Sequence, residues 1–159
     1  MLDTLDADDT LTSEQKKQVS DLRKQLEEAE IETLRQEVNE QQQQKSEKWQ
    51  EFVSRMDELE ESDLKIDSAT TIENKLALTT TAFEQWDVLL MEMYDYLAGV
   101  LNADQYASEK AARDQWEQKR EEEAKNAAEG ADGTAAQLAS YSFRQSYTKA
   151  RCYKLLDMM

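Results

Sequence analysis

The sequence predicts an all-α protein, a helical bundle in which three helices of a C-terminal domain follow a long helix or a helical hairpin. The 159 residues include no proline and only three glycines, whereas strand-rich folds need more turn residues. The densest apolar segment is residues 83–101. Six of its apolar side chains recur at three- and four-residue spacing: Phe83, Trp86, Leu90, Met93, Leu97 and Val100. On a helix this spacing forms one wide stripe, which other helices must cover.

The N-terminal part predicts a disordered acidic lead-in at residues 1–11 and a long helix or helical hairpin at residues 12–64. Thr12 and Gln15 form a capping-box pattern, so the helix should begin near Ser13. The run NEQQQQK at residues 39–45 has no apolar residue. It is either the exposed middle of one helix or the bend of a hairpin. Apolar periodicity returns after it at Trp49, Phe52, Met56 and Leu59.

Residues 70–159 form the predicted C-terminal domain. Asp63, Asp67 and Ser68 indicate a loop over residues 61–69, just before this domain. Thr70 and Glu73 give a second capping-box pattern, which predicts the start of a central helix over residues 71–101.

Two more helices follow in the predicted domain. One covers residues 103–128, and its inward side chains should be Tyr106, Ala112, Trp116 and Ala124. Two glycines and an aspartate predict a turn at residues 129–134. The last helix covers residues 135–156, with one face formed by Leu138, Tyr141, Thr148, Cys152 and Leu155. On that face Cys152 is expected to be a small buried hydrophobe rather than a reactive thiol.

The charge and composition restrict the partners. The net charge of −16 disfavours nucleic acid and an anionic membrane surface, because both attract basic proteins. A basic protein partner is compatible with it. No apolar run approaches the length that a membrane-spanning helix requires.

The sequence offers no catalytic, cofactor-binding or metal-binding constellation, and we expect no enzyme. Histidine is absent, and Cys152 is the only cysteine, so there is no Cys–His pair, zinc cluster or internal disulfide. Asp63 and Asp67 resemble half of a calcium loop, but its glycine and bidentate glutamate are missing. There is no glycine-rich phosphate loop.

Residues 70–159 resemble the LprI-like family of lysozyme inhibitor domains. The family pattern combines a Trp-Asp helix, a helix with Trp and a nearby Arg, a glycine-containing turn, and a last helix with Thr-x-x-Arg before a Leu. The matching residues are Trp86, Asp87, Leu90, Tyr94, Leu97 and Leu101, then Trp116 and Arg120, then Gly133 and Thr134, then Thr148, Arg151 and Leu155.

The resemblance implies an extracytoplasmic bacterial protein that binds a lysozyme, held at the cell envelope by a lipid or leader that this chain lacks. A basic lysozyme would suit the acidic charge, and occlusion of its cleft would inhibit it. Asp132, Gly133 and Thr134 are the candidate contacts. The alternative is a non-catalytic envelope adaptor whose coiled-coil-like N-terminal helix pairs with another envelope protein or with a second copy.

The matched polar residues also have a structural interpretation, which we favour over direct contact with a ligand. Asp87, Arg120, Thr148 and Arg151 lie next to predicted core positions. A half-buried pair of Asp87 with Arg120 or Arg151 would fix how the helices align.

Overall fold

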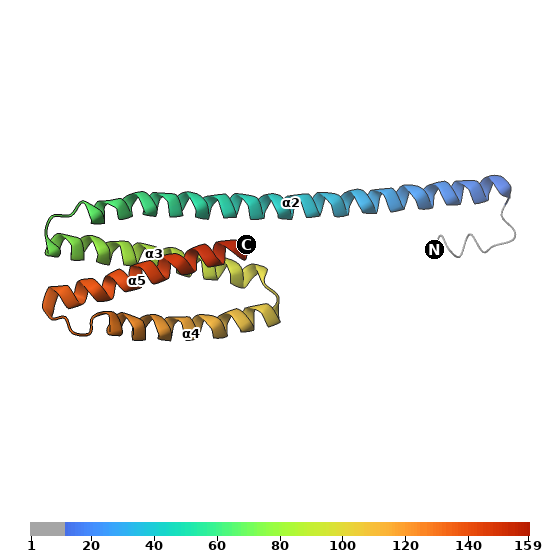
Figure 1. Cartoon of the computed structure of the whole chain (residues 1–159). Coiled ribbons are helices and arrows are strands. Elements are labelled where there is room, and N and C mark those ends of the chain that lie inside the picture. The colour runs from blue at the N-terminus through green and yellow to red at the C-terminus, as the bar shows by residue number, and fades with distance from the viewer. Residues whose placement is uncertain (1–11) are drawn as a thin grey trace. The chain divides into compact units, whose positions relative to one another are not determined.

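The computed structural model describes residues 12–159, and in this part of the chain there are four helices and no strand (Figure 1). They are α2 (Ser13–Asp67), α3 (Ile72–Val100), α4 (Ala103–Ala127) and α5 (Gly133–Asp157). The predicted all-α fold is confirmed, with one long helix before three shorter ones. The predicted lead-in, residues 1–11, lies outside the described residues.

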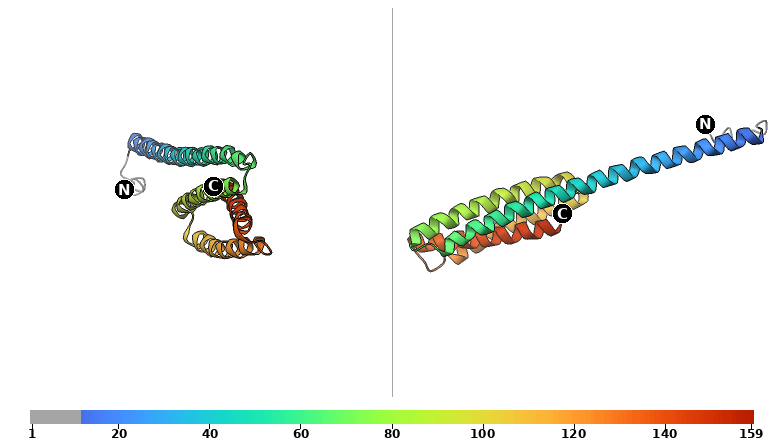
Figure 2. Two further views of the ribbon diagram at one scale, coloured as in Figure 1. Left: turned by 90° about the vertical axis from the view of Figure 1, so that its left-hand side faces the viewer. Right: turned by 90° about the horizontal axis from the view of Figure 1, so that it is seen from above.

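The described part of the chain divides into two units, with the boundary between residues 47 and 48. In the second unit, residues 48–67 of α2 are followed by α3, α4 and α5, and successive helices run in opposite directions (Figures 1 and 2). α5 packs against both α3 and α4. The functional division into residues 12–64 and 70–159 stays a prediction.

The core of the second unit is built on α3, as the apolar stripe predicted. Its fully buried side chains come from α2, α3 and α5: Phe52, Met56, Trp86, Leu89, Leu90, Met93, Leu97, Cys152 and Leu155. Two expected core positions are wrong, because Val100 and Tyr106 are exposed. Val100 is the last residue of α3, and Tyr106 lies in the first turn of α4. Helix ends extend past the packed centre of a bundle, so apolar side chains there remain in solvent.

Local capping residues explain where the helices begin. The predicted box at Thr12 and Gln15 is confirmed, because each backbone N–H donates to the side chain of the other residue, at 2.9 and 3.2 Å. The box predicted at Thr70 is wrong by one residue. Thr71 is the N-cap of α3, and its hydroxyl accepts from the Asn74 N–H at 3.2 Å. Asn102 caps α4 in a complete capping box.

The loop predicted over residues 61–69 is wrong for most of its length, because α2 continues to Asp67. Loop-type residues are tolerated there because the Asp63 carboxylate accepts hydrogen bonds from Trp86 and Gln145 inside the bundle. The predicted turn before the last helix is confirmed around Gly130, which has a φ of 81°. Gly133 has a φ of 59° and begins α5, two residues earlier than predicted.

In the first unit, residues 13–47 are helical, including residues 39–45. The sequence left a bend or a continuous helix open at this run, and the structure selects the continuous helix. Large apolar side chains in this unit are half exposed at five positions, which are Leu22, Leu26, Ile31, Leu34 and Val38. No helix in residues 12–159 is long and apolar enough to cross a membrane.

Candidate functional site

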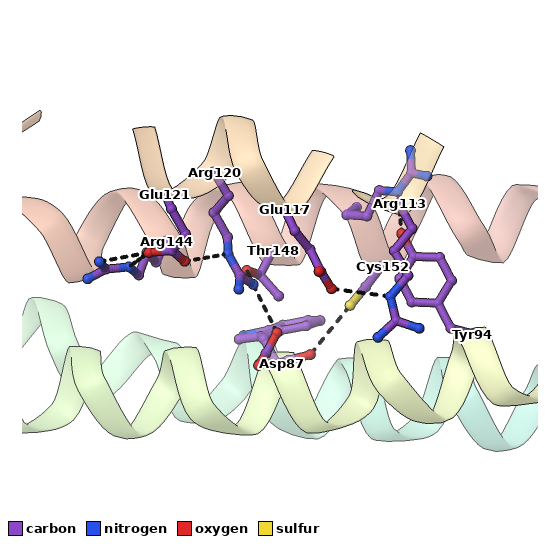
Figure 3. Close-up of polar contacts among 11 residues, drawn as sticks. Asp87, Tyr94, Arg113, Glu117, Arg120, Glu121, Arg144, Thr148 and Cys152 are labelled. Carbon is purple, nitrogen blue, oxygen red and sulfur yellow. Dashed lines mark hydrogen bonds and ion pairs between the residues drawn. The ribbon is translucent and has the colours of Figure 1, made fainter. Parts of the chain in front are cut away.

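Asp87 and Arg120 form an ion pair between α3 and α4 (Figure 3). Arg120 Nη1 donates to Asp87 Oδ1 at 2.9 Å and to the hydroxyl of buried Thr148 on α5 at 3.2 Å. The guanidinium side chain is only 11% exposed and the carboxylate 23% exposed. The first of the two predicted pairings of Asp87 is therefore confirmed, and one arginine ties three helices together.

Aromatic rings and a second acid surround the Arg120 guanidinium. Its central carbon lies 5.2 Å from the centre of the Phe83 ring and 5.0 Å from that of Trp116. Its Nε donates to Glu121 at 3.1 Å, and Glu121 also accepts from Arg144 of α5 at 3.0 Å (Figure 3). Burial raises the pKa of the Glu121 carboxyl, but Arg144 and Arg120 outweigh it, so the net pKa is lowered.

Arg151 forms a second buried contact, with different partners from those of Arg120. Its Nε donates to the Tyr94 hydroxyl at 2.9 Å, and its Nη2 donates to Glu109 of α4 at 2.6 Å. The guanidinium of Arg113 also lies over the Tyr94 ring, 4.5 Å from the centre of the ring. Burial of Tyr94 raises the pKa of its phenol. The alternative pairing of Arg151 with Asp87 is not the one that the structure adopts.

Asp63 of α2 connects three helices, and the sequence interpretation missed this role. Its Oδ2 accepts from Trp86 Nε1 and Gln145 Nε2, both at 3.0 Å, and from Lys149 Nζ at 3.3 Å. The indole N–H of a fully buried tryptophan needs an acceptor, so a carboxylate on the preceding helix was the feature of the sequence that could have predicted this hydrogen bond. The spacing could not indicate which of the many carboxylates supplies it.

Glu60, Lys149 and Tyr153 extend this cluster toward solvent. Glu60 accepts from Lys149 Nζ at 2.6 Å and from the Tyr153 hydroxyl at 2.8 Å. Burial raises the pKa of Glu60, but the hydrogen bonds from Lys149 and Tyr153 and the lysine charge leave it below 4.5. Burial lowers the pKa of Lys149, and Glu60 and Asp63 raise it above 10.5 overall. Burial and the adjacent Glu60 raise the pKa of Tyr153 to about 12.

We expect Glu60→Gln to lower the free energy of unfolding at pH 7 and to have a smaller effect in acid. The pKa of Glu60 is lowered in the folded state. The contribution of Glu60 to the free energy of unfolding is therefore present above pH 4.5 and is lost as the pH falls through the folded-state pKa. Urea unfolding of both proteins between neutral pH and about pH 3 measures this difference. Glu122→Gln, at an exposed position of α4, is the control. A difference that stays constant over this range would contradict the assignment.

Cys152 is fully buried, as expected, and its thiol donates weakly to the Trp86 carbonyl at 3.7 Å. Burial and the nearby Asp87 charge raise the pKa of the thiol to about 12. The thiolate is therefore scarce at neutral pH, and Cys152 serves as a packing residue.

The structure divides the remaining family-motif residues between the core and a surface turn. Trp86, Leu90, Tyr94, Thr148, Arg151 and Leu155 are buried. Trp116 is partly buried and stacks on Tyr147, with ring centres 5.3 Å apart.

The candidate contacts lie away from this buried network, where α5 begins. Asp132 is the N-cap of α5, is exposed, and makes no capping hydrogen bond through its side chain. Gly133 is exposed and Thr134 is partly buried. These three residues therefore lie together at the start of α5 and take no part in the contacts of the Asp87–Arg120 cluster.

The fold and these clusters define an all-α domain in which paired polar side chains hold the helices in register. The sequence model of one family, described as Lysozyme inhibitor LprI, matches residues 65–155. The match covers more than half of the chain, and the chain belongs to this family. Searches of curated proteins and of solved structures returned no match.

Proposed function

We propose that this protein is an extracytoplasmic inhibitor that binds a basic lysozyme at the cell envelope and occludes its substrate cleft. Membership of the LprI lysozyme inhibitor family carries the proposal. The net charge of −16 supports it, because an acidic protein associates faster with a basic one. A non-catalytic role fits the two largely buried ion pairs, Asp87 with Arg120 and Glu109 with Arg151, since the charged groups of each pair already satisfy each other.

The proposed inhibition has two physical parts. Opposite charges first bring the two proteins together, and surface complementarity then holds the inhibitor over the cleft. Glycosidase clefts contain a pair of carboxylates, so an acidic protein must present a hydroxyl or a cation where it meets them. The start of α5 at Asp132, Gly133 and Thr134 is our candidate for part of this contact. Asp132 and Gly133 are exposed there, and Thr134 carries a hydroxyl.

The test is a titration of the full chain against a purified lysozyme that is positively charged at pH 7. Lysis of bacterial cell walls and direct binding are followed together, at low and at physiological salt. We expect stoichiometric loss of lysis, with binding that weakens but persists at physiological salt. Binding that disappears at physiological salt, while lysis continues unchanged, would reduce the interaction to charge attraction and contradict inhibition.

A second candidate function is a non-catalytic envelope adaptor that self-associates through its N-terminal helix. The half-exposed side chains of Leu22, Leu26 and Leu34 favour it, because an isolated helix gains little stability without a partner on its apolar positions. Sedimentation of the full chain over a range of concentrations separates the two candidates. An adaptor should self-associate and leave lysozyme active, whereas an inhibitor should bind lysozyme as a monomer.

A further inference from the structure

A shallow groove lies between α2 and α3 in the second unit, apart from the buried polar clusters. Its volume is about 290 Å3, and it is lined by Arg55, Glu58, Leu59, Glu84, Gln85 and Val88. Leu59 is partly buried and packs against the core, whereas Val88 is 53% exposed. Met91, about one turn further along α3, is 48% exposed. The groove and its continuation therefore present apolar surface to solvent.

The charges around the groove are mostly negative. Arg55 is paired with Glu92 of α3, so its cation is already neutralised. In the described part of the chain, neither Glu58 nor Glu84 has an ion-pair partner, and both are exposed. One comes from each helix. The groove thus combines an apolar surface with two unpaired carboxylates.

We propose that this groove receives a lysine or arginine side chain from the basic partner. The aliphatic stem would lie on Leu59 and Val88, and the cationic head would interact with Glu58 and Glu84. Long cationic side chains have this division into an apolar stem and a charged head, and the groove offers matching surfaces for both parts. The inference rests on the proposed function, because that function supplies a basic protein as the partner.

Charge complementarity decides between this occupant and others. A second copy of the chain carries the same net charge of −16 and would bring further carboxylates to an acidic rim. An uncharged apolar segment would cover Val88 and Met91 but would leave Glu58 and Glu84 partly desolvated and without a counter-charge. A basic protein surface covers the apolar side chains and at the same time supplies cations that pair with the carboxylates.

The first test compares two double variants of the full chain in binding to a purified, positively charged lysozyme. Glu58→Gln with Glu84→Gln removes both groove carboxylates. Asp114→Asn with Glu122→Gln removes the same charge from exposed positions of α4. At physiological salt we expect the groove variant to bind about tenfold more weakly and the α4 variant to change less than about twofold. Thermal unfolding of both variants verifies that the fold is retained.

The outcomes separate the groove from the function. Equal weakening by both variants would show that overall charge attracts lysozyme and would overturn the groove as the docking site. If the groove variant binds lysozyme as well as the wild-type protein does, the groove is overturned as the docking site, but the proposed function stays intact. Wild-type protein that does not bind lysozyme would overturn both.

A labelling experiment locates the contact independently of charge. Val88→Cys places a thiol in the groove, and Glu122→Cys places one on α4, while the native Cys152 is fully buried and gives a slow background. Saturating lysozyme should slow maleimide labelling of Val88→Cys several-fold and leave Glu122→Cys unaffected. Equal labelling of Val88→Cys with and without bound lysozyme would overturn the proposal.

Discussion

Trp86→Ala is expected to lower the free energy of unfolding by about 4 kcal/mol. Trp86 is fully buried at the centre of α3, and its indole N–H donates to Asp63 at 3.0 Å. Truncation would leave a large cavity and would deprive Asp63 of one of its donors. Urea unfolding followed by circular dichroism measures the change. A loss of about 4 kcal/mol is a large part of the stability of a domain of this size, so partial unfolding at room temperature is also an expected result.

Trp49→Ala is the matched control, because Trp49 is 37% exposed and lies outside the core cluster. It should cost about 1 kcal/mol or less. Similar losses for the two tryptophan variants would contradict the position of Trp86 at the centre of the core.

Asp87→Ala should destabilise the fold by about 2 kcal/mol before it affects any binding. Its loss leaves the Arg120 guanidinium, only 11% exposed, without its carboxylate partner on α3. Thr148 and Glu121 still accept hydrogen bonds from Arg120, so the expected cost lies below that of a fully orphaned buried cation. The melting temperature and the urea midpoint measure this loss. An unchanged melting temperature would overturn the structural role of the pair.

The double variant Asp87→Ala with Arg120→Met distinguishes an unpaired charge from a lost contact. Removing both charges should recover part of the stability that Asp87→Ala loses, because no buried cation is then left without its partner. Asp114→Ala, at an exposed position of α4, is the single-residue control and should change stability by less than about 0.5 kcal/mol. Lysozyme binding by the folded fraction of Asp87→Ala should match the wild-type protein if Asp87 acts only within the fold.

The helices and their order could be predicted from the sequence because they depend on local signals. The three- and four-residue spacing from Phe83 to Leu97 identified the main core helix. Within that span every position of the stripe is buried except Phe83, which is partly buried. Capping patterns and glycines located the first residues of three helices, Ser13, Ile72 and Gly133, to within one or two residues. The largest local error, the loop at residues 61–69, arose where a tertiary contact at Asp63 outweighed local preference.

The sequence by itself therefore determined an acidic, all-α member of a lysozyme inhibitor family, because periodicity, capping and family motifs are written along the chain. Only the tertiary structure decided which polar groups meet: Asp87 with Arg120, Arg151 with Tyr94 and Glu109, and Asp63 with Trp86. With 35 acidic residues in the chain, many pairings satisfy the same spacing. The packing of residues 48–67 of α2 with α3, α4 and α5 selects among them, because burial makes an unpaired charge costly and the geometry leaves few partners within reach.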